Sequence, residues 1–157
     1  MATEIERKFL VTSDSWRKSA RGTRFQQGYL STDPQRSVRV RIAGEQAWPT
    51  ITGQTDGIRR SEFEYPVPPG DATELMALCL PTVISKTRYR VTVGQHVWEV
   101  DEFHGDNDGL VVAEIELGSV DESFERPDWL GEEVSHDLRY FNSSLTSHPF
   151  SRWGKTD

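Results

Sequence analysis

Ionisable side chains recur at every second position in several segments of the chain. Acidic pairs occupy Glu4 and Glu6, Glu62 and Glu64, Glu99 and Asp101, and Glu114 and Glu116, whereas basic pairs occupy Arg39 and Arg41, and Lys86 and Arg88. Carboxylates bind hard divalent cations such as Mg²⁺ and Mn²⁺, and guanidinium or ammonium groups bind phosphate oxygens. Brought together, the two sets would support phosphoryl transfer to water, which needs no Ser or Cys nucleophile.

A spacing of two puts each pair on one face of a β-strand, because successive side chains point to opposite faces. Alternation of this kind predicts eight strands, at Glu4–Val11, Arg24–Ser31, Ser37–Ile42, Gln46–Thr52, Arg60–Pro66, Lys86–Val93, His96–Glu102 and Leu110–Leu117. Gly94-Gln95 predicts a tight hairpin. Helices are predicted from a capping box at Asp71 to Leu80, near Ser13–Ala20, around Ser135–Tyr140 and after Asn142.

Many short strands with few helices predict an α+β protein, mainly antiparallel β, closed into an eight-stranded barrel. Two carboxylates about 5 Å apart repel by about 3 kcal/mol, so a fold keeps such pairs where a cation or ligand compensates them. We therefore expect the charged faces to line the interior, acids on one wall and bases on the other, with apolar faces outside. The alternative is a β-sandwich with one solvated face and no site.

Length and composition narrow the class of protein. The 157 residues fit one domain, 1–157, and the net charge of −7 argues against duplex nucleic acid as a partner. The sequence contains no apolar run of about 18 residues and no secretory leader pattern, and the single Cys79 excludes a disulfide framework. We expect a cytoplasmic monomer or homodimer that binds a small polyanion, without membrane contact.

The segment Glu4-Ile-Glu6-Arg7-Lys8 resembles the ExExK signature of the CYTH superfamily, the triphosphate tunnel metalloenzymes. The resemblance covers nearly the whole chain, through Gln27–Leu30, Val38–Arg41, Arg60–Glu64, Lys86–Tyr89, Glu99–Asp101, Glu114–Glu116, Gly131–Val134 and Arg139-Tyr140. It implies a tunnel of eight antiparallel strands, dependence on a divalent metal (Mg²⁺ or Mn²⁺) and action on triphosphates. The short, single-domain form is most similar to the bacterial branch.

The resemblance also implies roles for individual residues. It assigns the metal ion to Glu4, Glu6, Glu62, Glu64, Asp101, Glu114 and Glu116. It assigns the triphosphate to Lys8, Arg39, Arg41, Lys86, Arg88 and Arg139, the last at one tunnel mouth. It assigns catalysis to Lys8, Tyr29, Lys86 and Arg88.

The expected reaction is hydrolysis of inorganic tripolyphosphate to pyrophosphate and phosphate. The alternatives are a nucleotide triphosphate enzyme (a nucleotidase or a class IV adenylate cyclase) and a non-catalytic module that binds polyphosphate or nucleotide. One segment departs from the family pattern: where relatives carry a lysine in a Thr-Ile-Lys-Gly type motif, this chain has Thr52, and Pro49 precedes it in the same strand. We expect a locally distorted strand, and weaker triphosphate binding or a different substrate.

Overall fold

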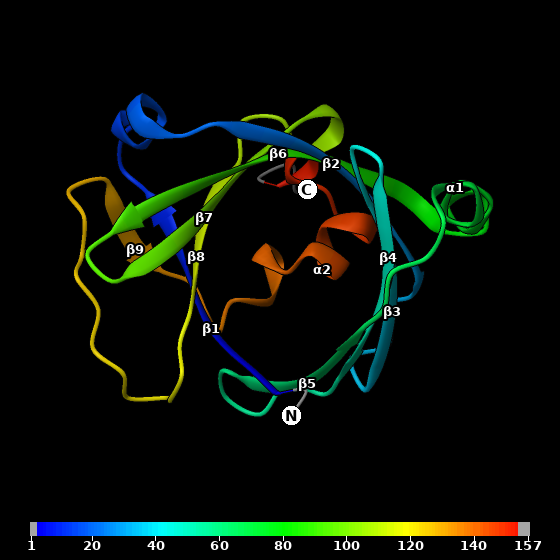
Figure 1. Cartoon of the computed structure of the whole chain (residues 1–157), viewed down its shortest axis with the longest axis horizontal. Helices are drawn as coiled ribbons and strands as arrows, with labels where there is room; N and C mark the ends of the chain where they lie inside the picture. The colour runs from blue at the N-terminus through cyan, green and yellow to red at the C-terminus, as the bar shows by residue number, and fades with distance from the viewer. Residues whose placement is uncertain (1–2, 154–157) are drawn as a thin grey trace.

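The computed structural model describes residues 3–153 and is a closed antiparallel β-barrel (Figure 1). Its strands are β1 (Thr3–Val11), β2 (Gly22–Ser31), β3 (Arg36–Ala43), β4 (Gln46–Gly53), β5 (Arg59–Glu64), β6 (Leu80–Val93), β7 (His96–Phe103), β8 (Val111–Glu116) and β9 (Leu130–Glu133). The sheet order is β5-β4-β3-β2-β6-β7-β8-β1-β9, and pairing of β1 with β5 closes the first eight strands into a ring. The predicted closed eight-stranded barrel is confirmed.

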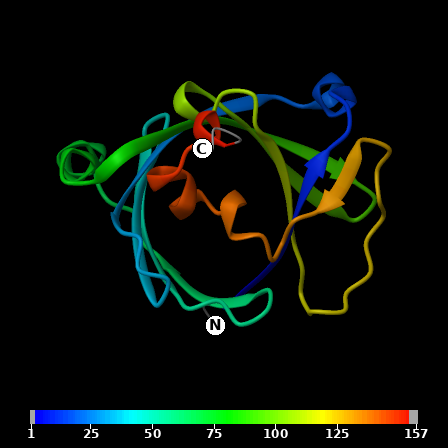
Figure 2. The same cartoon turned by 180° about the vertical axis from the view of Figure 1, so that it is seen from behind.

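Within residues 3–153, two α-helices and four short 3₁₀ turns accompany the barrel. The helices are α1 (Pro69–Ala77) and α2 (Asn142–Ser147), and the 3₁₀ turns are Ser15–Ser19, Gly105–Asn107, Leu138–Tyr140 and Phe150–Arg152. Helix α1 lies outside the barrel beside β3 and β4, whereas α2 lies across the ring of strands in both end-on views (Figures 1 and 2). Over residues 3–153, no helix has the length and apolar character needed to cross a bilayer.

The eight predicted strands are present, with small shifts at their ends and an early start for β6 at Leu80. Two predictions were wrong in detail. Helix α1 begins at Pro69 with Pro68 as its N-cap and no side-chain cap, so Asp71 lies in its first turn and forms no capping box. The short strand β9 was not predicted; it forms by pairing with the outer edge of β1 through a register shift.

The apolar faces of the strands point away from the barrel axis, as the sequence predicted, and pack under segments that cover the wall. The largest cluster includes Phe9, Trp16, Trp98, Val100, Ile115 and Trp129. A second lies beneath the C-terminal segment and includes Ile84, Phe103, Val112, Tyr140 and Leu145. A third joins Val40 and Ala47 to Ala72 of α1. Burial of these faces outside the ring leaves the interior for polar side chains.

Two glycines meet specific conformational demands. Gly94 has φ of 62° in the turn that joins β6 to β7, which confirms the predicted hairpin. Gly28 of β2 lies so close to the end of α1 that an added Cβ would stand 2.8 Å from Cβ of Cys79. Cys79 is half-buried against this glycine, where it packs with the third apolar cluster.

The expected distortion of β4 is absent. All eight of its residues pair with β3 in unbroken register, including Pro49 opposite Val40. Because the Ala43–Gln46 pair closes the turn and hydrogen-bonded pairs alternate, the nitrogen of Pro49 faces away from β3. On its other side, paired residues of β5 begin only at Thr50 opposite Glu64. The missing N–H of the proline therefore leaves the pairing with β3 intact and falls on the side of β5, where Tyr65 N still donates to the carbonyl oxygen of Pro49 at 3.4 Å.

Candidate active site

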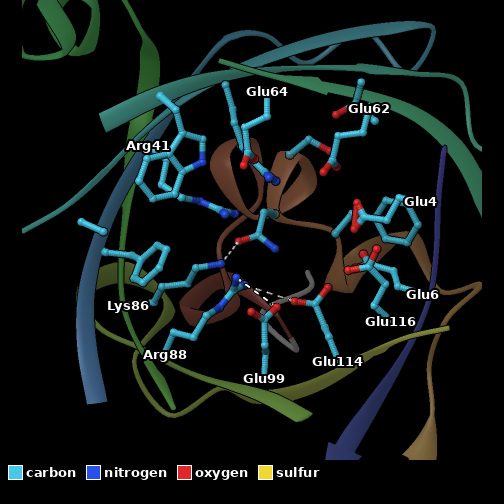
Figure 3. A pocket seen from close by; sticks show the side chains of 18 of the residues that line it. Glu4, Glu6, Arg41, Glu62, Glu64, Lys86, Arg88, Glu99, Glu114 and Glu116 are labelled. Carbon is cyan, nitrogen blue, oxygen red and sulfur yellow. Dashed lines mark hydrogen bonds and ion pairs between the residues drawn. The ribbon is translucent and has the colours of Figure 1, made fainter. Parts of the chain in front are cut away.

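The barrel encloses a cavity of about 820 Å³ whose lining is mostly charged. Its predicted members are Glu4, Glu6, Lys8, Tyr29, Arg39, Arg41, Glu62, Glu64, Lys86, Arg88, Glu114 and Glu116. Figure 3 shows the separation of charge that the sequence predicted: Arg41, Lys86 and Arg88 lie on one side of the view, and Glu4, Glu6 and Glu116 lie on the other. We call these two sides the base wall (Arg39, Arg41, Lys86 and Arg88) and the acid wall (Glu4, Glu6, Glu62, Glu64, Glu114 and Glu116).

Strand β3 supplies the two guanidinium groups of the base wall that have no acidic partner. Within residues 3–153, no carboxylate oxygen lies within 4.0 Å of Arg39 or Arg41. Nε of Arg39 is buried without a hydrogen-bond acceptor. Arg41 is 6% exposed and donates from Nε to Oε1 of Gln27, 3.1 Å away. Burial, with the nearby charges of Arg39 and Arg88, lowers the pKa of Arg41 to about 9. Buried cations of this kind favour an anionic ligand.

Strand β6 supplies the other half of the base wall, and Asp101 of β7 holds it from behind. Nζ of Lys86 lies 2.8 Å from Oδ2 of Asp101. Arg88 donates to both oxygens of the same carboxylate, from Nε at 2.7 Å and Nη2 at 2.9 Å. Burial lowers the pKa of Lys86 to about 7, although the charge of Asp101 opposes this shift. The ammonium group can therefore gain or lose a proton near neutral pH.

Lys8 of β1 stands where the two walls meet. Its Nζ lies 3.5 Å from Oε2 of Glu114, whose other oxygen lies 3.4 Å from Nη2 of Arg88. Burial opposes ionisation of Glu114, but Lys8 and Arg88 outweigh it and lower the pKa well below its ordinary value. Nζ of Lys8 also lies 5.0 Å from the ring centroid of Phe141. The lysine is thus held between acid and aromatic partners at the edge of the cavity.

The acid wall brings three carboxylates together around one guanidinium group. Nη2 of Arg60 lies 3.7 Å from Oε2 of Glu4, 3.3 Å from Oε1 of Glu6 and 3.4 Å from Oε2 of Glu62. Strand pairing explains this convergence, because Arg60 lies directly opposite Glu4 and two residues before Glu62 on the same face of β5. Arg60 is the internal cation of the acid wall.

One internal cation does not neutralise this group. Burial, followed by the charge of Glu6, raises the pKa of Glu4 to about 10. Burial and Glu114 likewise raise the pKa of Glu6. In Glu62 burial is outweighed by a hydrogen bond to Glu4 and by Arg39, so its pKa is lowered. The cluster therefore holds protons that an added cation would displace.

The acid wall fits a hard divalent cation in its donor chemistry. All its members offer carboxylate oxygens, which Mg²⁺ and Mn²⁺ prefer. Oε2 of Glu4 is buried and accepts no hydrogen bond in the described part of the chain, so this oxygen is available as a ligand for a metal ion. The side chains between residues 3 and 153 form no ready-made group of three metal ligands, and Arg60 lies within 4 Å of Glu4, Glu6 and Glu62.

Helix α2 and the residue before it close one end of the cavity, and sequence reasoning missed their contribution. Phe141, Asn142 and Ser143 line the cavity. Oδ1 of Asn142 accepts hydrogen bonds from Nζ of Lys86 at 3.1 Å and from Nε2 of Gln27 at 2.9 Å. No spacing pattern signals Asn142, because tertiary folding alone brings it to the barrel. Arg60 and Glu99 also line the cavity; the alternating pattern had identified Glu99 as a member of an acidic pair, but neither residue was given a role in the predicted site.

The structure does not bring two of the predicted site residues into the cavity lining. Asp101 is 2% exposed, and the longer side chains of Lys86 and Arg88 cover it and occupy both its oxygens. Its position fits the support of two cations, and the prediction that it binds metal is not matched. Arg139 points to solvent, where Nη2 lies 2.7 Å from Oδ2 of Asp137 and the guanidinium packs against Trp153. The prediction that Arg139 binds triphosphate is likewise not matched.

Known proteins are similar to this chain in both sequence and fold. The CYTH domain family model matches residues 2–149. An inorganic triphosphatase of Acetivibrio thermocellus is 44% identical over 154 residues, which cover 98% of this chain and 99% of that protein. An inorganic triphosphatase of Nitrosomonas europaea is 36% identical, with 91% and 96% covered. The crystal structure of an inorganic triphosphatase matches with a TM-score of 0.65 at 31% identity, covering 90% of this chain and 96% of that one.

Proposed function

The chain belongs to the CYTH domain family, and from this premise we propose that it is an inorganic triphosphatase. The proposed reaction is metal-dependent hydrolysis of tripolyphosphate to pyrophosphate and phosphate. The two relatives at 44% and 36% identity, both named inorganic triphosphatase, support this choice of substrate. Triphosphatases of the family depend on a metal ion, and we propose Mg²⁺ or Mn²⁺ here because the acid wall offers only carboxylate oxygens.

One observation carries the proposal: two guanidinium groups without acidic partners, Arg41 buried and Arg39 half-buried, face a wall of carboxylates that lines the same cavity. Arg39 and Arg41 lack the negative charge that would neutralise them, and in the acid wall one guanidinium group, Arg60, is shared by three carboxylates. A triphosphate with a bound divalent cation supplies negative charge to the arginines and positive charge to the acid wall. Neither ligand alone would balance the cavity.

The residues that line the cavity would divide the work of binding between the two ligands. Arg39, Arg41, Lys86, Arg88 and Lys8 would hold the phosphate oxygens, and Glu4, Glu6, Glu62, Glu64, Glu114 and Glu116 would hold the metal ion. When bound, the metal ion neutralises negative charge on the phosphates. Positioning and charge neutralisation of this kind account for most of the catalysis of phosphoryl transfer.

Water is the proposed nucleophile. The only cysteine, Cys79, lies outside the barrel against α1, away from the cavity lining. Lys86 and Tyr29 both line the cavity, and the pKa of Lys86 at about 7 suits a group that donates a proton to a phosphate oxygen. We assign Lys86 this role and give Tyr29, Arg88 and Lys8 the support of the transferred phosphoryl group.

A hydrolysis panel tests the proposal. The protein is assayed with tripolyphosphate, ATP and thiamine triphosphate, each with Mg²⁺ or Mn²⁺, and a Lys86→Met preparation purified in parallel reports contaminating phosphatase. The expected result is release of phosphate from tripolyphosphate with the highest kcat/KM of the three substrates. Preference for ATP would favour a nucleotide triphosphate enzyme instead. Tight tripolyphosphate binding without turnover in either metal would favour a binding module.

A further inference from the structure

We propose that Asn142 is a positioning residue that aims the Lys86 ammonium group at the substrate. This inference deepens the proposed function and rests on it for the identity of the substrate. Asn142 is the first residue of α2, at the closed end of the cavity. Its side-chain oxygen accepts from Nζ of Lys86 at 3.1 Å, and the same amine lies 2.8 Å from Oδ2 of Asp101.

The surroundings of Lys86 explain why a second acceptor matters. Its side chain is 0% exposed, so each N–H that finds no partner would be left without water. One N–H reaches Asp101 and one reaches Asn142, and the third remains for the cavity that Lys86 lines. Without Asn142, the flexible lysine chain would be drawn fully onto Asp101, away from the phosphate.

The same oxygen atom also reaches the unpaired half of the base wall. Gln27 is 0% exposed; its Nε2 donates to Asn142 and its Oε1 accepts from Nε of Arg41 at 3.1 Å. Asn142 therefore ends a chain of neutral groups that orients Lys86 and Arg41 together. A neutral acceptor fixes the direction of a cation and leaves its charge available to the substrate, whereas a carboxylate here would cancel part of it.

Two substitutions of Asn142 separate the loss of the hydrogen-bond acceptor from the addition of a negative charge, and they should change kcat and KM differently. Asn142→Ala removes the acceptor, and we expect kcat for tripolyphosphate to fall about tenfold while KM changes less than about threefold, since four other cations still bind the substrate. Asn142→Asp keeps the acceptor and adds a negative charge, so we expect KM to rise about tenfold. Ser147→Ala, at an exposed position on the same helix, is the matched control and should resemble the wild type.

A second measurement needs no substrate. In ¹H–¹⁵N spectra of the side-chain amines at about pH 6, where the ammonium form predominates, the Lys86 signal is identified by its loss in Lys86→Met. We expect this signal in the wild type, in Ser147→Ala and in Asn142→Asp, and its shift or broadening in Asn142→Ala. If wild-type protein fails to hydrolyse tripolyphosphate, the proposed function fails and this spectrum alone decides the role of Asn142. An unchanged Lys86 signal in Asn142→Ala, or an unchanged kcat, would overturn the inference.

Discussion

The two walls of the cavity differ in how far the protein itself neutralises them. On the acid wall, one guanidinium group, Arg60, serves three carboxylates at once. On the base wall, Lys86 and Arg88 share the buried carboxylate of Asp101, while Arg39 and Arg41 have no such partner among residues 3–153.

The difference shows why two ligands are needed. The acid wall can reduce its excess charge by taking up protons, as the raised pKa of Glu4 indicates. The unpaired arginines of the base wall cannot lose their charge in this way: even with its pKa lowered to about 9, Arg41 stays protonated at neutral pH. A cation that displaces protons from one wall and an anion that balances the other therefore complete the site.

Removing charge from the acid wall should have the largest effect. We expect Glu4→Gln combined with Glu6→Gln to lower tripolyphosphate hydrolysis about 10³-fold, because two of the carboxylates proposed to hold the metal ion are lost. Steady-state rates and Mg²⁺ binding by calorimetry check this. Glu74→Gln, which removes an exposed acid on α1, is the control. A double variant that keeps wild-type Mg²⁺ affinity would show that the acid wall is not the metal site.

Removing charge from the unpaired part of the base wall should have the next largest effect. We expect Arg39→Met and Arg41→Met each to lower kcat/KM about 10²-fold, since each loses a charge-assisted contact to phosphate. Kinetics on tripolyphosphate provide the measurement. In Arg36→Met the lost guanidinium is 68% exposed and paired with Asp33, so activity should stay near the wild-type level. Equal losses of kcat/KM in all three variants would mean that the two arginines in the cavity contribute no more to activity than an exposed arginine.

Thermal stability tests the role of Arg60 as the internal cation of the acid wall. We expect Arg60→Met to lower the Tm of the metal-free protein by about 5 °C, because three carboxylates then lack their shared partner. Millimolar Mg²⁺ should restore part of the loss, since the metal ion supplies the missing charge. Differential scanning calorimetry with and without Mg²⁺ measures both, beside Arg59→Met at an exposed position of the same strand. A Tm that does not respond to Mg²⁺ in Arg60→Met would separate Arg60 from the metal site.

The smallest expected effect comes from adding charge to β4. Thr52 lines the cavity opposite Glu62 and is 7% exposed, at the position where the family pattern has lysine. Thr52→Lys should lower KM for tripolyphosphate about threefold, because a further cation would face the phosphates. Thr52→Met, of similar length without the charge, is the control. No gain in affinity or rate would mean that the present base wall already suffices.

Local alternation was enough to predict the walls, because side chains two residues apart must share a face once strands form. It could not predict which side chains meet after closure. Asp101 shares the inward face of β7, yet it is too short to pass the lysine and arginine that cover it. Asn142 reaches the cavity only because α2 packs across the barrel, and β9 exists only because the edge of β1 is open to it.

Predictions from local sequence signals were also wrong at the start of α1 and at Pro49. The Asp71 capping box agrees with helix signals in the sequence, but the proline at Pro69 starts the helix earlier, at a position that tolerates a missing N–H. Pro49 suggested a distorted strand, but its nitrogen faces away from β3, so the register with that strand is unbroken.

In the proposed site, metal and triphosphate meet inside the barrel, each against its own wall. A crystal of the Lys86→Met variant, soaked with Mn²⁺ and tripolyphosphate, tests it most directly through anomalous scattering from manganese. We expect a manganese peak among Glu4, Glu6 and Glu62, and phosphate density against Arg39 and Arg41. Manganese bound only on the outer surface, or phosphate density absent from the cavity, would contradict the account.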